Sequence, residues 1–145
     1  MEIYIHMNKK KINPNCKLAI EEYVKRVSPF CKIKLMSYKD FSKINLHNNS
    51  KIFQIIPGAC TISSTDLAKL ISQITLSGTS CLEFIIPEIA LEKRIENESN
   101  PSMAQYDVSD ISFSSFESSP DITAVYATEQ LYRAFTILNN ITYHK

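Results

Sequence analysis

The last three residues of the chain, Tyr143-His144-Lys145, carry a phenol, an imidazole and an amine, which are side chains that hydrogen-bond and exchange protons. They follow a helical stretch that contains Arg133. Chain ends usually fray, so a functional tail has to be held in place by the rest of the fold. The tail is therefore a candidate site. These residues also have non-functional explanations: Arg133 could form an i,i+4 ion pair with Glu129, and Tyr143 and His144 could belong to an ordinary ordered tail.

Motifs that depend on glycine are excluded. Gly58 and Gly78 are the only glycines, so neither the GxGxxG dinucleotide fingerprint nor a P-loop is present. GxSxG is absent as well and the three histidines are scattered along the chain, which leaves a Ser-His-Asp hydrolase with little support. From the residues alone, the sequence predicts a polar ligand bound at the C-terminal ends of its strands.

The cysteines and the N-terminal residues indicate the cellular compartment in which we expect the protein. Cys16, Cys31, Cys60 and Cys81 form no CxxC pair, and no histidine stands at zinc-ligand spacing from them. We expect reduced thiols and no metal site. The N-terminus lacks the charge order of a secretory signal, and no apolar run approaches the roughly 20 residues of a membrane span. We therefore expect a soluble, cytoplasmic protein that does not bind membranes.

The charge is unevenly distributed, although the net charge is only +1. Residues 1–45 contain ten Lys and Arg against four Asp and Glu, whereas the rest contains six against eleven. The densest basic cluster consists of Lys9-Lys10-Lys11, Lys17, Lys25 and Arg26. This pattern permits a basic face for a polyanion, and ordinary solvated charges explain it equally well.

Hydrophobic periodicity predicts alternating strands and helices. Expected strands lie at residues 2–7, 31–35, 51–57, 81–86 and 111–113. Expected helices lie at 15–27, from a cap at Ser63 or Ser64 to Gly78, near 91–96, and from Ser119-Pro120-Asp121 onward. Residues 40–50 are predicted to form a polar loop. This alternation predicts one α/β domain over residues 1–145 with a mostly parallel sheet.

Each long helix has an expected buried stripe. The expected buried residues are Leu18, Ala19, Tyr23, Val24 and Val27 in the first helix, Leu67, Leu70, Ile71 and Ile74 in the second, and Ala124, Ala127, Leu131, Ala134, Phe135 and Leu138 in the last. Asn15 is the expected cap of the first helix.

Several motifs in the same chain order carry a family resemblance. Residues 129–135, EQLYRAF, fit E-x-[LV]-Y-R-A-[FW], and the final Tyr143-His144-Lys145 fits Y-H-[KR]. Glu21–Arg26 fits E-E-Y-x-K-R, and Pro57-Gly58 fits a middle segment. The chain resembles the rRNA large-subunit methyltransferase H family over nearly its whole length.

The resemblance implies a SPOUT-type α/β knot, with a C-terminal trefoil knot and a homodimer. It implies transfer of a methyl group from S-adenosyl-L-methionine to N3 of a pseudouridine in 23S rRNA within the assembled ribosome. By motif position, Tyr143 or His144 would hydrogen-bond the base or accept its proton. Arg133 would stabilise the base anion or a phosphate.

The resemblance also implies a donor-binding set. Its residues here are Ile55, Pro87, Glu88, Phe113, Ser114, Ser115 and Phe116. Pro87-Glu88 replaces a Gly-Gly of the family, and Pro has no N–H to offer a ligand. Ser119-Pro120 and Ala124 replace a Pro-His and an Arg. These differences leave an alternative open: a catalytically impaired dimeric relative that acts as a ribosome-associated or scaffold protein.

Overall fold

The structure, a computed structural model, describes residues 1–88 and 105–143. Its elements are β1 (Glu2–Met7), α1 (Pro14–Val27), β2 (Lys32–Ser37), the 3-10 helix η1 (Phe41–Lys43), β3 (Lys51–Ile55), α2 (Ser64–Leu76), β4 (Cys81–Ile86), β5 (Val108–Ile111) and α4 (Pro120–Leu138). The helix expected near residues 91–96 lies outside the described residues. The predicted α/β class with alternating strands and helices is confirmed.

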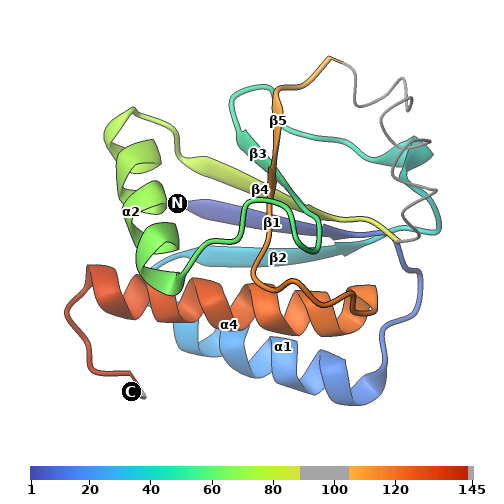
Figure 1. Cartoon of the computed structure of the whole chain (residues 1–145), viewed down its shortest axis with the longest axis horizontal. Helices are drawn as coiled ribbons and strands as arrows, with labels where there is room; N and C mark the ends of the chain where they lie inside the picture. Colours follow the sequence, from blue (N-terminus) through green and yellow to red (C-terminus); the bar gives the residue numbers. More distant parts are fainter. Residues whose placement is uncertain (89–104, 144–145) are drawn as a thin grey trace.

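The five strands form one parallel sheet in the order β2-β1-β4-β3-β5 (Figure 1). In the register, His6 of β1 lies beside Ile85 of β4, and Phe53 of β3 lies beside Phe84. Because all strands run the same way, β3, β4 and β5 end at a common edge. The loops that follow them therefore meet there.

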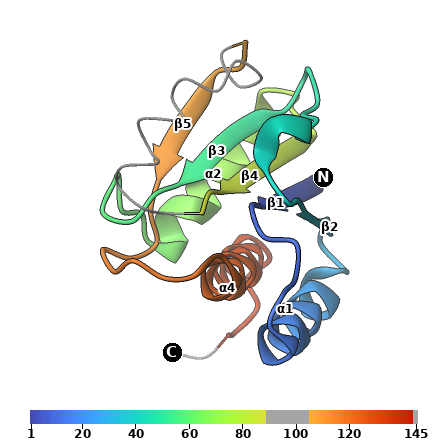
Figure 2. The same cartoon turned by 90° about the vertical axis from the view of Figure 1, so that its right-hand side faces the viewer.

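One face of the sheet carries the main hydrophobic core. Alternate strand residues such as Ile3, Ile5 and Phe84 have no exposed surface, as the period of two requires. α4 packs against both α1 and α2 on this side, and Figure 2 shows α4 and α1 nearly end-on and side by side. α4 thus occupies the centre of the helical layer.

The opposite face is covered in part by the segment between β2 and β3. Phe41 and Leu46 are buried there over Ile52 and Ile85. The predicted polar loop at residues 40–50 is therefore corrected: it contains η1 and a small core of its own. Its few apolar residues fold onto the sheet because the adjacent strands leave apolar surface uncovered.

The start of α1 differs from the expectation. Asn13, and not Asn15, is the cap: its side chain accepts hydrogen bonds from the backbone N–H groups of Asn15 and Cys16. Pro14 occupies the first turn, where its missing N–H costs nothing. Leu18 was expected in the core and is 65% exposed, while Ile20 is buried instead.

The ends of α2 agree with the local sequence signals. Ser63 caps the helix in a capping box with Asp66, the first of the two caps considered. Gly78 follows the helix with a φ of +89°, a left-handed conformation that glycine adopts without strain.

The start of α4 is held by tertiary contacts. The Ser119 side chain makes no capping hydrogen bond. Asp121 is buried, and it pairs with Lys9 Nζ at 2.8 Å and accepts the Asn13 N–H at 2.7 Å. These contacts tie the loop before α1 to the last helix. At the other end Leu138, expected in the core, is 37% exposed.

The last strand and the second strand are shifted from their expected positions. β5 covers Val108–Ile111 and not residues 111–113, and Ser112 contributes only an isolated bridge to Thr61. β2 covers Lys32–Ser37 and not residues 31–35. The period-two pattern indicated the strands but not where the pairing partners begin and end.

Candidate functional site

A recess lies where the loops after β3 and β5 meet the first turns of α4. It encloses about 280 Å³ of space, open solvent included. Its lining residues are Ile55, Pro57, Ser112, Phe113, Ser114, Phe116, Ser118, Thr123 and Tyr126. Aromatic rings and hydroxyl groups thus surround one concave surface at the carboxyl edge of the sheet.

Ser112 joins the two loops that shape this recess. Its Oγ accepts N–H hydrogen bonds from Gly58 and Ser114, each at 3.2 Å, and donates to the carbonyl of Ser114. Its backbone N–H donates to the Cys60 carbonyl, and its carbonyl accepts the Ile62 N–H, both at 2.9 Å. Since Ser112 is buried, these bonds fix the loops before any ligand arrives.

Four of the seven expected donor-binding residues line the recess: Ile55, Phe113, Ser114 and Phe116. The other three, Pro87, Glu88 and Ser115, do not. Pro87 is buried directly after β4, and Glu88 is exposed. The structure therefore brings together the expected residues at the ends of β3 and β5, and not those that follow β4.

The recess has the chemistry that an adenosyl group requires. Phe113 and Phe116 offer ring faces, and Phe116 is 79% exposed, so it can cover a bound base. Ser114 and Ser118 line the recess with hydroxyls for polar atoms of a nucleoside, whereas the Ser112 hydroxyl is already used within the loops. These residues could hold S-adenosyl-L-methionine, while Pro87, which follows β4 and does not line the recess, has no backbone N–H to offer it.

The tail lies farther along α4. Arg133 donates from Nη2 to Glu129 Oε1 at 2.6 Å, which is the i,i+4 ion pair considered from the sequence. Its guanidinium lies 5.6 Å from the centre of the Tyr143 ring. That ring makes an edge-on contact with Tyr132, with centroids 4.7 Å apart. The tail is thus pinned to the helix as far as Tyr143, whereas His144 and Lys145 lie outside the described residues.

Tyr143 is a hydrogen-bonding phenol rather than a base. Burial, together with a hydrogen bond to Tyr23, raises the pKa of Tyr143 to about 12. The side chain is therefore protonated at neutral pH.

The recess and the tail are separate within one chain but share a face of α4. Tyr126 lines the recess, and Arg133 follows it by seven residues, which is nearly two turns and about 10 Å along the axis. Seven residues return a side chain to almost the same side of a helix. The structure thus brings Arg133 and Tyr143 together but does not bring them into the recess.

Comparisons with known proteins identify the family. A family model described as "Predicted SPOUT methyltransferase" matches residues 1–144. "Ribosomal RNA large subunit methyltransferase H 1" of Thermoanaerobacter sp. is 33% identical over 149 residues and covers 100% of both chains. "Ribosomal RNA large subunit methyltransferase H" of Oenococcus oeni is 30% identical over 149 residues and covers 88% of each. The chain belongs to the methyltransferase H family of SPOUT type.

The tail motif had indicated the methyltransferase H family. Two features of the structure were not predicted from the sequence: the recess residues Tyr126 and Ser112, and the histidine contacts of Glu83. Tyr126 and Ser112 were not expected at the site, although the i,i+7 spacing of Tyr126 and Arg133 is a signal that they share a helix face. His6 and His47, two of the three scattered histidines, both contact Glu83. The sequence signal for the His6–Glu83 contact is that each residue stands between apolar neighbours within its strand.

All four cysteines are unpaired, as expected, and burial raises the pKa of Cys31 to about 12. Among residues 1–88 and 105–143, no helix is long and apolar enough to cross a membrane.

Proposed function

We propose that this chain uses S-adenosyl-L-methionine to methylate N3 of a pseudouridine in 23S rRNA within the assembled ribosome. The observation that carries the proposal is the recess, where Ile55, Phe113, Ser114 and Phe116 meet at the carboxyl edge of the sheet. The printed names of the relatives, all rRNA large subunit methyltransferases, support the RNA substrate.

The residues of the recess would hold the donor, which supplies an electrophilic methyl group on a cationic sulfur. Phe113 and Phe116 would stack on its base, and the serine hydroxyls would bind its sugar. Holding the two reactants in line supplies most of the acceleration that such a transfer needs.

The tail would act on the RNA. N3 of the base must lose a proton, and Tyr143, being protonated, would donate a hydrogen bond to a base oxygen instead of accepting that proton. His144 would be the proton acceptor. Arg133, 40% exposed beside Glu129, would stabilise the negative charge on the base or a phosphate.

We also propose a homodimer with a C-terminal trefoil knot. α4 and the residues after it expose apolar side chains at two places, called the strip here: Ile122 and Tyr126 near the start, and Ile137, Leu138 and Ile141 near the end, with the Arg133–Glu129 pair between them. Exposed apolar surface of this kind is typical of a protein interface. A second copy seated on the strip would place one tail near the recess of its partner, which a single chain does not achieve. The placement of α4 against both α1 and α2 is compatible with the knot.

The basic cluster provides a surface for RNA. Lys10, Lys11, Lys17, Lys25 and Arg26 are all exposed, on the loop before α1 and on the outer side of that helix. A small enzyme that docks on a large particle needs positive charge only where phosphate lies.

The alternative is a scaffold protein that has lost donor binding, and the loop after β4 is the observation that favours it. Pro87 is buried and has no N–H, and Glu88 places an exposed carboxylate next to it, near where the carboxylate of a donor would lie. Both readings share the dimer, so donor binding separates them.

Calorimetric titration with S-adenosyl-L-methionine, for the parent chain and for Pro87→Gly, tests the proposal. Micromolar binding, about −8 kcal/mol, is expected for the parent. Transfer of labelled methyl groups to ribosomes would follow. Absence of binding by both proteins, with circular dichroism showing that both are folded, would overturn the methyltransferase proposal and favour the scaffold. Binding by Pro87→Gly alone would show that Pro87 prevents donor binding in the parent chain. It would also favour the scaffold function for the parent chain.

A further inference from the structure

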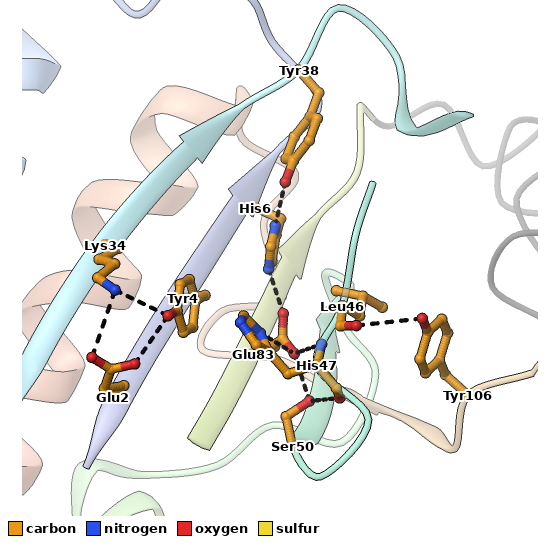
Figure 3. Close-up of polar contacts among 10 residues, drawn as sticks. All are labelled: Glu2, Tyr4, His6, Lys34, Tyr38, Leu46, His47, Ser50, Glu83 and Tyr106. Atoms are coloured by element: carbon orange, nitrogen blue, oxygen red, sulfur yellow. Dashed lines mark hydrogen bonds and ion pairs between the residues drawn. The ribbon is translucent and has the colours of Figure 1, made fainter. Parts of the chain in front are cut away.

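A polar cluster lies on the face of the sheet opposite the helices, and none of its residues lines the recess; Figure 3 shows His6, His47 and Glu83 of this cluster. Cys81 and Glu83 stand two residues apart on β4, so their side chains lie on the same face. His6 on the neighbouring β1 and His47 in the loop before β3 approach them. The cluster thus combines a thiol, a carboxylate and two imidazoles from three segments.

Glu83 is the centre of the cluster and is fully buried. Its Oε2 accepts a 2.7 Å hydrogen bond from His6 Nε2. Its Oε1 accepts hydrogen bonds from the His47 backbone N–H at 2.6 Å and from Ser50 Oγ at 2.5 Å. A carboxylate with this many donors is ionised and rigidly oriented.

His47 leaves one of its ring nitrogens close to the same carboxylate. Nδ1 lies 3.2 Å from Glu83 Oε1, and the ring is held against Tyr4 with centroids 4.5 Å apart. The His47 side chain is 51% exposed, so this side of the cluster opens to solvent. An ion could enter without disturbing the fold.

The three potential ligand atoms lie close together, somewhat farther apart than in a metal centre. His47 Nδ1, Cys81 Sγ and a carboxylate oxygen of Glu83 all lie within 4.8 Å of one another. Bonds of about 2.0–2.3 Å in a tetrahedral zinc site place ligand atoms about 3.4–3.7 Å apart. Nδ1 and Oε1 are already near this distance, so a small rotation of the exposed His47 and of the Cys81 side chain completes the set.

We propose that His47 Nδ1, Cys81 Sγ and Glu83 Oε1 bind Zn²⁺ or a similar borderline divalent transition metal, with the fourth position open to solvent. One sulfur, one nitrogen and one oxygen form a donor set that zinc accepts and that Mg²⁺ and Ca²⁺ do not prefer. His6 donates to the opposite oxygen, Oε2, and Ser50 donates to Oε1 itself, so both orient the carboxylate as outer partners of metal ligands do.

The protons balance as follows. The Cys81 thiol releases its proton to solvent when the metal–sulfur bond forms. In the free protein His47 Nδ1–H faces the Glu83 carboxylate; when the ion binds, the imidazole proton would be carried on Nε2, so that the Nδ1 lone pair faces the ion.

The position of the ligands in the chain explains why spacing did not indicate them. His47 and Glu83 are 36 residues apart, and no CxxC or HxxxH pair is involved. Only the pairing of the strands and the folding of the loop onto the sheet bring the three together. The bound ion would fasten residues 44–50 to the sheet.

Titration of the purified, chelator-treated full-length chain with Co²⁺ tests the proposal. We expect one ion per chain, visible absorption of tetrahedral intensity and a near-ultraviolet thiolate-to-cobalt band, all displaced by Zn²⁺. Cys81→Ser should abolish the thiolate band. Ser50→Ala should weaken binding by about 10–100-fold, the range for an outer partner. Cys60→Ser, at an exposed cysteine outside the cluster, is the matched control and should leave the spectrum unchanged.

A Co²⁺ spectrum without a thiolate band would overturn the proposal, as would a band that persists in Cys81→Ser. A third contrary outcome is equal binding by His47→Ala and the parent. Because none of these residues lines the recess, either result leaves the proposed methyl transfer to be judged on its own assay.

Discussion

Nε2 of His6 lies 2.7 Å from Oε2 of Glu83, and both side chains are almost completely buried. Tyr38 Oη lies 3.0 Å from the other ring nitrogen, so the histidine links a tyrosine to a carboxylate across the sheet (Figure 3). The pair lies on the less covered face of the sheet, where the main core does not reach. Two predictions depend on it.

His6→Leu should destabilise the fold by about 3–5 kcal/mol, because it leaves Glu83 buried without one of its donors. Urea denaturation in the presence of a chelator measures this loss without a contribution from any bound ion. The double variant His6→Leu/Glu83→Leu should lose less than the sum of the two single variants. Additive losses would mean that the two side chains do not stabilise each other.

Stability should fall in acid because of Glu83. Burial by itself raises the pKa of this carboxyl, but the hydrogen bonds from His6, Ser50 and the His47 N–H together outweigh it and hold the pKa below the ordinary 4.5. A lowered pKa contributes stability that is present above pH 4.5 and is lost as the pH falls through the folded-state value.

Thermal unfolding between neutral and acid pH checks this dependence. Glu83→Gln should be less stable near neutrality and show a flatter decline in acid. Glu22→Gln, on the exposed side of α1, breaks the pair with Arg26 and serves as the control with a parental profile. A parental profile for Glu83→Gln would contradict the prediction.

Phe116→Ala should weaken S-adenosyl-L-methionine binding by about tenfold, since a stacked ring contributes roughly 0.5–1.5 kcal/mol. The free energy of unfolding should not change, because the ring is 79% exposed. Calorimetry gives the affinity. Leu76→Ala, at an 85% exposed side chain at the end of α2, is the control and should bind as the parent does. Equal affinities for both variants would place the donor elsewhere.

Arg133→Gln should lower the rate of methyl transfer by about 100-fold and leave donor affinity unchanged, because the guanidinium acts on the developing charge. Tyr143→Phe should lower the rate less, since it keeps the ring contact with Tyr132 and removes only the hydroxyl. Ribosome methylation under single-turnover conditions gives both rates. Unchanged rates would show that Arg133 and Tyr143 have no role in catalysis and that the tail is an ordinary ordered segment.

Ile137→Glu should convert the proposed dimer into monomers, since it places a charge in the apolar strip of α4. Sedimentation equilibrium measures the mass. Leu76→Glu adds the same charge at an exposed apolar residue outside the strip and should remain dimeric. If both variants remain dimers, the dimer interface lies on another surface.

Local features of this fold follow from the sequence because each depends on neighbours in the chain. The capping box of Ser63 and Asp66 and the left-handed Gly78 involve a few consecutive residues. Alternation in β1 likewise reflects the geometry of a strand. The tail motif was enough to recognise the family, since it is a specific run of residue types.

Other features were decided by packing. Leu18 and Leu138 belong to helical stripes yet are exposed, because a stripe identifies an apolar side without saying how far its neighbours extend over it. Asp121 has the pattern of a solvated first-turn acid, but Lys9 and Asn13 approach it from another segment and bury it.

The recess and the cluster around Glu83 likewise depend partly on the local sequence and partly on the tertiary structure. Residue types and family motifs indicated Phe113, Ser114 and Phe116, but only the pairing of β3 with β5 brings their loop to Ile55. His6 and Glu83 are 77 residues apart, and they meet because β1 pairs with β4 in a particular register. Periodicity determines which way a side chain faces within its own strand or helix; strand order and register, set by burial of the whole core, determine what it meets.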